Sequence, residues 1–132
     1  NGALLCTRAV HKSMTERGGG AIVNQSSTAA WMGASYYGIA KLALHAITQS
    51  LARELGPAGI RVNALAPGPT NTQATRDIVP EAFIGDLLKG MCIQRMGEPE
   101  DLVGTCLFML SDEAKWMTAQ IVAVDGGQIM RT

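Results

Sequence analysis

The chain has 132 residues, which is enough for one ordinary domain with a core and short for two. Charged residues make up only 17% of it, against roughly 25% in typical soluble domains, so we expect a partner to bury part of the surface. Eleven basic residues balance eleven acidic ones, which argues against binding to nucleic acid or to an anionic membrane.

Cys6, Cys92 and Cys106 are widely spaced and form no CxxC pair, which predicts buried free thiols in a reducing compartment and no metal site. The two histidines, His11 and His45, have no partners at metal-ligand spacing and are expected on helix surfaces or interfaces. No apolar run approaches the roughly 18–20 residues needed to cross a bilayer, and no leader-like segment opens the chain. We therefore expect a cytoplasmic protein.

The hydrophobic spacing predicts helices and strands in alternation. A helix over residues 3–17 ends at three glycines, and a short strand follows at 21–25. A loop around Trp31 leads into a long helix over 35–55, which Gly56-Pro57 terminates, and the next strand spans 60–66.

The second half of the chain is less regular. Apart from one short helix over 81–90, residues 70–99 read as loop, and a loop of that length is often a lid. A helix over 100–110 and a strand over 120–124 complete the pattern, and Trp116 between them is expected in the core or in a subunit contact. Strands that alternate with helices predict an α/β fold with a parallel sheet covered on both faces. Three strands are few for such a sheet, so we expect half of it to be missing.

Tyr37 and Lys41 lie four residues apart at the start of the long helix, so both side chains share one face. A nearby ammonium stabilises a phenolate and draws the pKa of a tyrosine down from about 10 toward a useful range for acid–base catalysis. The alternative is an exposed tyrosine stacked over a solvated lysine. Tyr36 lies about 100° further round the helix and is the poorer candidate.

Ser26 and Ser27 end the first strand, and Pro67-Gly68 ends the second, so both segments reach the carboxyl edge of the predicted sheet. Ligands of open α/β sheets bind outside that edge. A serine hydroxyl there can donate a hydrogen bond to a substrate oxygen, although Ser27 has the alternative role of capping a turn.

The segments 24–27, 37–41 and 61–68, which read NQSS, YGIAK and RVNALAPG, resemble the short-chain dehydrogenase/reductase family, and in particular its 3-oxoacyl reductases. The segments 95–101, 111–114 and 124–127 fit the C-terminal pattern of that family, so the resemblance covers the whole chain. It implies the C-terminal half of a doubly wound, parallel-sheet Rossmann fold in the order α-β-α-β-lid-α-β, with the lid over about residues 70–97.

The resemblance also implies roles for single residues. Tyr37 would be the general acid or base, Ser27 would polarise the substrate oxygen, and Lys41 would lower the pKa of Tyr37 and bind the nicotinamide ribose. The nicotinamide pocket of NAD or NADP would be lined by Pro67, Gly68, Thr70 and Thr72. The implied reaction is hydride transfer between the cofactor and a secondary alcohol, ketone or oxoacyl substrate.

Two departures from the family pattern bear on these expectations. The glycine-rich turn that binds the pyrophosphate is absent, so we expect the nucleotide-binding N-terminal half to be missing and residues 1–132 alone to be inactive. Only nine residues separate Ser27 from Tyr37, which shortens the loop between them. Apolar residues are frequent in residues 70–95 and suit an apolar carbonyl or alcohol substrate, or else pack the lid onto the sheet. The resemblance further implies a homodimer or homotetramer. The rival hypothesis is an inactive module that serves only subunit association.

Overall fold

The computed structural model describes residues 2–33 and 35–130. Helices and strands alternate along the chain as the spacing of apolar residues predicts. The elements are α1 (Gly2–Glu16), β1 (Gly20–Gln25), α2 (Ala29–Met32), α3 (Tyr36–Leu55), η1 (Gly56–Ala58), β2 (Ile60–Pro67), α4 (Gln73–Ile78), α5 (Glu81–Lys89), α6 (Pro99–Leu110), η2 (Asp112–Ala114) and β3 (Ile121–Val124).

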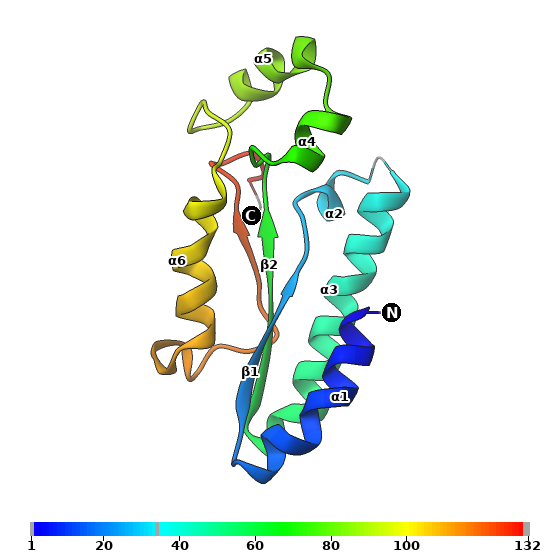
Figure 1. Cartoon of the computed structure of the whole chain (residues 1–132), viewed down its shortest axis with the longest axis vertical. Coiled ribbons are helices and arrows are strands. Elements are labelled where there is room, and N and C mark those ends of the chain that lie inside the picture. The colour runs from blue at the N-terminus through cyan, green and yellow to red at the C-terminus, as the bar shows by residue number, and fades with distance from the viewer. Residues whose placement is uncertain (1, 34, 131–132) are drawn as a thin grey trace.

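In the described part of the chain, one sheet holds three parallel strands in the order β1-β2-β3. Helices α1 and α3 lie together on one face of this sheet and α6 lies on the other, which gives three layers (Figure 1). The sequence prediction of an α/β fold with a covered parallel sheet is confirmed. Among the described strands, β1 pairs only with β2, so β1 has one open edge.

All three strands run in the same direction, so their carboxyl ends meet at one edge of the sheet (Figure 1). Gln25 at the end of β1 is in register with Leu65, and Pro67 at the end of β2 is in register with Val124. Helices α4 and α5 lie beyond this edge. The side chains that follow the strands are therefore brought to one rim, between the sheet and residues 70–97.

The core forms between α3 and the sheet. Leu51, Leu55, Ile60 and Val62 are buried there, because one face of the long helix and one face of β2 carry apolar side chains. On the other side, the guanidinium of Arg61 fastens the end of α6 to the sheet. It donates to the carbonyl oxygens of three residues at 2.8, 3.3 and 3.0 Å, namely Met109, Met117 and Ser111.

Two short helices fall where the sequence predicts loop. Helix α2 is a single turn that ends at Gly33 in a left-handed conformation. Helix α4 begins at Gln73 and is capped by Thr72, whose hydroxyl accepts from the N–H of Thr75. Both helices are too short for apolar periodicity to reveal them. The Thr72 cap is the signal that the sequence offers for α4.

Two sequence predictions about single residues are wrong. His45 is buried within the chain rather than at the helix surface or an interface, and Cys6 and Cys92 are exposed rather than buried. Trp116 is fully exposed, which excludes the core, and its place in a subunit contact stays a prediction. His11 is exposed, as expected. Exposure of His11, His45 and Cys6 depends on which face of α1 or α3 meets the sheet, whereas Cys92 and Trp116 lie in loops. Composition reveals neither the helix face nor the packing of a loop.

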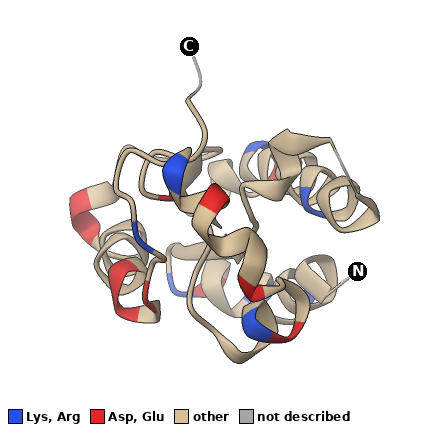
Figure 2. Ribbon diagram, turned by 90° about the horizontal axis from the view of Figure 1, so that it is seen from above, with Lys and Arg blue, Asp and Glu red and all other residues tan. Residues whose placement is uncertain are grey.

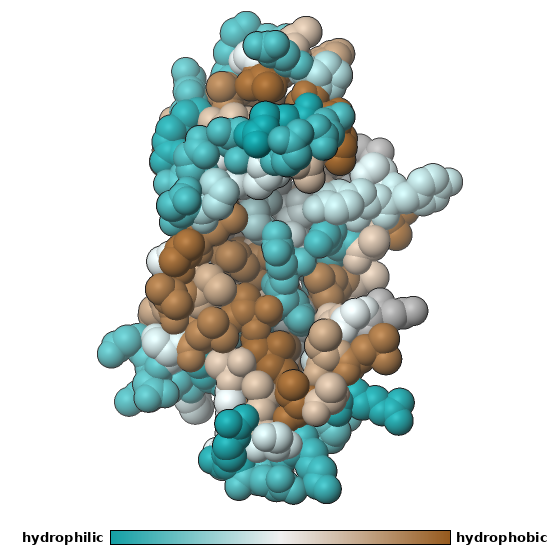
Figure 3. Space-filling view, viewed as in Figure 1, coloured by the Kyte–Doolittle hydropathy of each residue, from teal (hydrophilic) through white to brown (hydrophobic). Residues whose placement is uncertain are grey.

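Apolar side chains gather on the outer faces of the helices. In Figure 3 they cover much of α6 and its surroundings, where Val103, Leu107 and Phe108 are each exposed by 46% or more. Seen from above, charges of both signs are scattered over several helices (Figure 2). Within the described ranges, none of the helices is long and apolar enough to cross a membrane.

Candidate active site

The first turns of α3 place Tyr37 and Lys41 on one face. Ser35 caps the helix, and its hydroxyl oxygen accepts from the N–H of Gly38 at 3.1 Å. Gly38 packs closely against the preceding segment, because a Cβ atom there would lie 2.6 Å from the carbonyl oxygen of Ala29. The local sequence thus fixes both where α3 begins and how closely it approaches α2.

Lys41 connects the helix to the end of β1. Its Nζ donates to the carbonyl oxygen of Gln25 at 2.9 Å and lies 5.5 Å from the centroid of the Tyr37 ring. Tyr37 is 57% exposed and Tyr36 is 92% exposed. The structure therefore brings the phenol and the ammonium together at the carboxyl edge of the sheet, as the four-residue spacing predicts, and leaves the phenol accessible to a ligand.

Ser27 follows β1 and is half-buried. Its oxygen accepts from the N–H of Ala29 at 3.2 Å, which is the turn-capping role named as its alternative. This bond uses an oxygen lone pair, and a hydroxyl also carries a proton that it can donate. Capping and donation to a ligand are therefore compatible. The capping bond holds the oxygen in place.

The neighbouring Ser26 contacts α3, which was not predicted from the sequence. Its hydroxyl shares a 2.6 Å hydrogen bond with Nε2 of His45 and also donates to the carbonyl oxygen of Lys41 at 3.4 Å. The ring of Trp31 lies against His45, with 4.9 Å between centroids. The i, i+4, i+8 spacing of Tyr37, Lys41 and His45 was the available signal.

The ends of β1 and β2 are joined directly. Thr28 donates to the carbonyl oxygen of Pro67 twice, from its N–H at 3.0 Å and from its hydroxyl at 3.2 Å. Gly68 packs against the turn after β3, where a Cβ atom would lie 2.6 Å from Cα of Asp125. Pro67 and Gly68 thus share a rim with Ser27.

Thr70 and Thr72 make local contacts. The buried hydroxyl of Thr70 donates to the carbonyl oxygen of Gly68 at 3.0 Å, while that of Thr72 caps α4. Both follow Gly68 on the segment that leaves the rim. Their hydroxyls stabilise this connection.

The two ends of residues 70–97 meet at the rim. Residues Thr70 and Gly97 form a bridge, and Arg95 makes a two-bond ion pair with Asp101 at 2.6 and 3.0 Å. The hydrogen bond from Arg95 and that from the N–H of Glu98 lower the pKa of Asp101 to about 2. The carboxylate in turn raises the pKa of Arg95. The bridge and the ion pair together hold the two ends of residues 70–97 beside each other.

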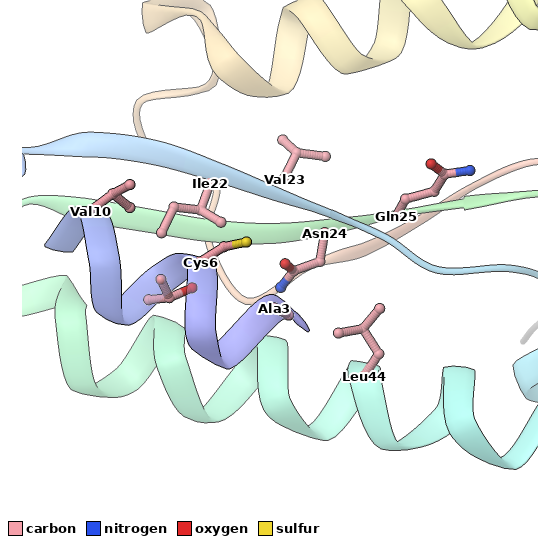
Figure 4. A pocket seen from close by; sticks show the side chains of 9 residues that line it. Ala3, Cys6, Val10, Ile22, Val23, Asn24, Gln25 and Leu44 are labelled. Carbon is pink, nitrogen blue, oxygen red and sulfur yellow. The ribbon is translucent and has the colours of Figure 1, made fainter. Parts of the chain in front are cut away.

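Two pockets lie near these residues. The larger, about 360 Å³, runs between α1 and the open side of β1 and reaches Gln25 (Figure 4). The smaller, about 210 Å³, lies under residues 91–97, between Thr70 and the end of β3. The larger pocket lies along the open edge of β1, and Tyr37 does not line it. The rim geometry therefore identifies the candidate site better than pocket size does.

A parallel sheet covered on both faces, with polar side chains converging at its carboxyl edge, defines the chain as an α/β protein of the doubly wound, Rossmann type. The family model described as enoyl-(acyl carrier protein) reductase matches residues 1–128. The chain belongs to the short-chain dehydrogenase/reductase family.

Relatives and solved structures agree with this assignment. The chain is 58% identical over 132 residues to an uncharacterized oxidoreductase of Mycobacterium tuberculosis, covering all of this chain and 53% of that protein. It is 44% identical over 124 residues to a 3α-hydroxysteroid dehydrogenase of Mediterraneibacter gnavus, covering 92% and 49%. The chain thus spans about half the length of these relatives.

Among solved structures, a 3-oxoacyl-[acyl-carrier protein] reductase from Brucella melitensis superposes with a TM-score of 0.90 at 35% identity, covering 98% of this chain and 50% of that one. A 7α-hydroxysteroid dehydrogenase in complex with NADH and 7-oxo glycochenodeoxycholic acid gives 0.91 at 31% identity, covering 95% and 50%. The Rossmann-type fold expected from the sequence is confirmed.

Proposed function

We propose that this chain is the catalytic, C-terminal part of an NAD(P)-dependent oxidoreductase that interconverts a secondary alcohol and a ketone or oxoacyl group. The observation that carries the proposal is the Lys41 ammonium, held at the rim by Gln25 and 5.5 Å from the Tyr37 ring. Membership of the family and the names of the relatives support the reaction class.

The rim residues fit a nicotinamide cofactor. An ammonium has three N–H donors, and the bond to Gln25 uses one, so Lys41 can also bind ribose hydroxyls. Gly68 packs against Asp125 too closely for a side chain, and we propose that Pro67 and Gly68 line the nicotinamide pocket. Thr70 and Thr72 would line the same pocket. When bound, the cofactor would supply the hydride.

The chain's own residues handle the proton. In reduction Tyr37 donates its phenolic proton to the substrate oxygen, and the Lys41 ammonium stabilises the phenolate that remains. The hydroxyl of Ser27 donates a hydrogen bond to the same oxygen. The bond that Ser27 accepts from the N–H of Ala29 sets its position. In oxidation the roles of donor and acceptor reverse at the same atoms.

We propose an apolar carbonyl or alcohol substrate bound under residues 70–97, which serve as a lid. Ile78, Phe83 and Ile93 on that segment are exposed by 57% or more and are free to line a substrate. Half of the proposed Rossmann domain lies upstream in this scheme and would bind the nucleotide beside the open edge of β1. We also propose that the enzyme acts in the cytoplasm.

Subunit association is the second candidate function. Leu5 on α1 and Ile39 and Leu42 on α3 are exposed by 51% or more, so these adjacent helices present an apolar face. Apolar faces of this kind suit a homodimer or homotetramer. In the leading proposal the oxidoreductase also associates through this face. In the rival proposal the chain is an inactive module that serves subunit association alone.

The test compares Tyr37→Phe with Tyr36→Phe in the full-length gene product that carries these residues. NADH and NADPH are titrated by fluorescence, and turnover is measured with a 3-oxosteroid and an oxoacyl thioester. Loss of the phenolic proton donor should lower kcat about 10²–10⁴-fold in Tyr37→Phe with cofactor binding retained. Tyr36→Phe, the neighbouring substitution of the same kind, should keep its activity. Equal activity in both variants would refute the catalytic role of Tyr37.

A further inference from the structure

His45 is a buried imidazole that the proposed reaction does not use. It is 6% exposed and lies on the same face of α3 as Tyr37 and Lys41, about two turns beyond Tyr37 and one turn beyond Lys41. Its Nε2 shares a 2.6 Å hydrogen bond with Ser26, which is 2% exposed. A buried pair of this kind holds two backbone segments in one arrangement, because separating them leaves polar groups unsatisfied.

The residues on either side of Ser26, Gln25 and Ser27, both take part in the proposed site. Ser27 follows it and would donate to the substrate oxygen, and the carbonyl oxygen of Gln25 before it receives the Lys41 ammonium at 2.9 Å. The Ser26 hydroxyl also reaches the carbonyl oxygen of Lys41 at 3.4 Å. One side chain thus connects the backbone of β1 to the turn of α3 that carries the lysine.

A second side-chain hydrogen bond between β1 and α3 fixes which face of the helix meets the strand. Asn24 in β1, two residues before Ser26, donates to the hydroxyl of Thr48 at 3.0 Å. The contacts of Lys41, His45 and Thr48 with β1 therefore follow one another along the helix. Trp31 covers the imidazole from α2, with an interplanar angle of 45°.

From this geometry we infer that the Ser26–His45 pair is a positioning pair, which fixes the Lys41 ammonium and the Tyr37 phenol at their working distance from Ser27. The inference rests on the proposed function. Neither side chain touches the reacting atoms in this scheme, so both act through their neighbours. Misplacement of catalytic groups by about 1 Å lowers rates by about 10²-fold, which makes a positioning pair detectable in kcat.

The experiment uses the full-length gene product, with NADH or NADPH and a 3-oxosteroid as probes. Ser26→Ala and His45→Leu each remove the hydrogen bond. Each should lower kcat by about 10- to 100-fold while KM for the 3-oxosteroid stays near its original value, and each should weaken cofactor binding because the Lys41 ammonium is displaced. His45→Gln keeps a side-chain amide near the position of Nε2 and should recover most of the loss. The loss in the double variant should be clearly smaller than the two single losses combined, because both substitutions remove the Ser26–His45 hydrogen bond.

Rates are expressed per folded molecule, counted by cofactor-binding stoichiometry. If His45→Leu does not fold, Ser26→Ala gives the answer, because it removes a single buried oxygen. Unchanged kcat in Ser26→Ala, additive losses in the double variant, or a loss that vanishes per folded molecule would each overturn the inference. Tyr37→Phe measured beside them separates the two ideas. If it remains active, the proposed function has failed, whereas its inactivity beside a fully active Ser26→Ala refutes the positioning role alone.

Discussion

Gly38 should tolerate no side chain, although it lies in a helix where alanine is normally preferred. In α3 a Cβ atom at this position would lie 2.6 Å from the carbonyl oxygen of Ala29. Ordinary contacts of this kind begin near 3.4 Å. Gly38→Ala must therefore push α2 and α3 apart by several tenths of an ångström, between Tyr37 and Lys41.

The size of the effect follows from this overlap. Overpacking of a closely packed contact costs about 1–3 kcal/mol, and about 2 kcal/mol lowers Tm by roughly 4–8 °C in a domain of 150–250 residues. Gly104 in α6 provides the matched control, because a Cβ atom there meets nothing within 4 Å. Gly104→Ala should stabilise the protein by about 0.5–1 kcal/mol through helix propensity.

Thermal unfolding of the full-length proteins measures both variants, and kcat with a 3-oxosteroid measures the displacement at the site. We expect Gly38→Ala to unfold at lower temperature and to react more slowly, and Gly104→Ala to unfold at higher temperature with its rate unchanged. A Gly38→Ala protein as stable as the original would show that α2 moves aside without cost. The steric argument would then be wrong.

Arg61→Lys should destabilise the protein by about 2 kcal/mol in urea unfolding, because an ammonium cannot reach the three carbonyl oxygens that the guanidinium bonds; unchanged stability would contradict this. Asp101→Asn should be less stable at pH 7, since it loses the ion pair with Arg95. The depressed pKa of Asp101 stabilises the folded state above its ordinary value of 3.8, and this contribution is lost as the pH falls toward about 2, so the difference from wild type in urea unfolding should narrow over that range. If the difference in unfolding free energy between the two proteins stays the same across this pH range, the ion pair with Arg95 is not its cause. Gly68→Ala should unfold at lower temperature, because its Cβ would meet Asp125 at 2.6 Å; an unchanged Tm would mean that the turn yields.

Local patterns in the sequence were sufficient for the order of elements and for the pairing of Tyr37 with Lys41. Helical periodicity places residues four apart on one face, and Gly56-Pro57 ends α3 near the predicted residue. Both depend on neighbours along the chain. The α/β class followed from the alternation of helices and strands, which allows few arrangements.

Only the tertiary structure decided which face of α3 meets β1. That packing buries His45 beside Ser26, 19 residues away in sequence. The pairing of β1 with β2 likewise brings Thr28 to Pro67 across 39 residues. The structure also contains α2, a single turn that ends at a left-handed Gly33, and α4, a helix of six residues that Thr72 caps. Both are too short for apolar periodicity to reveal them. Contacts between distant segments depend on how whole faces pack against each other, and a local pattern of residues carries little information about that packing.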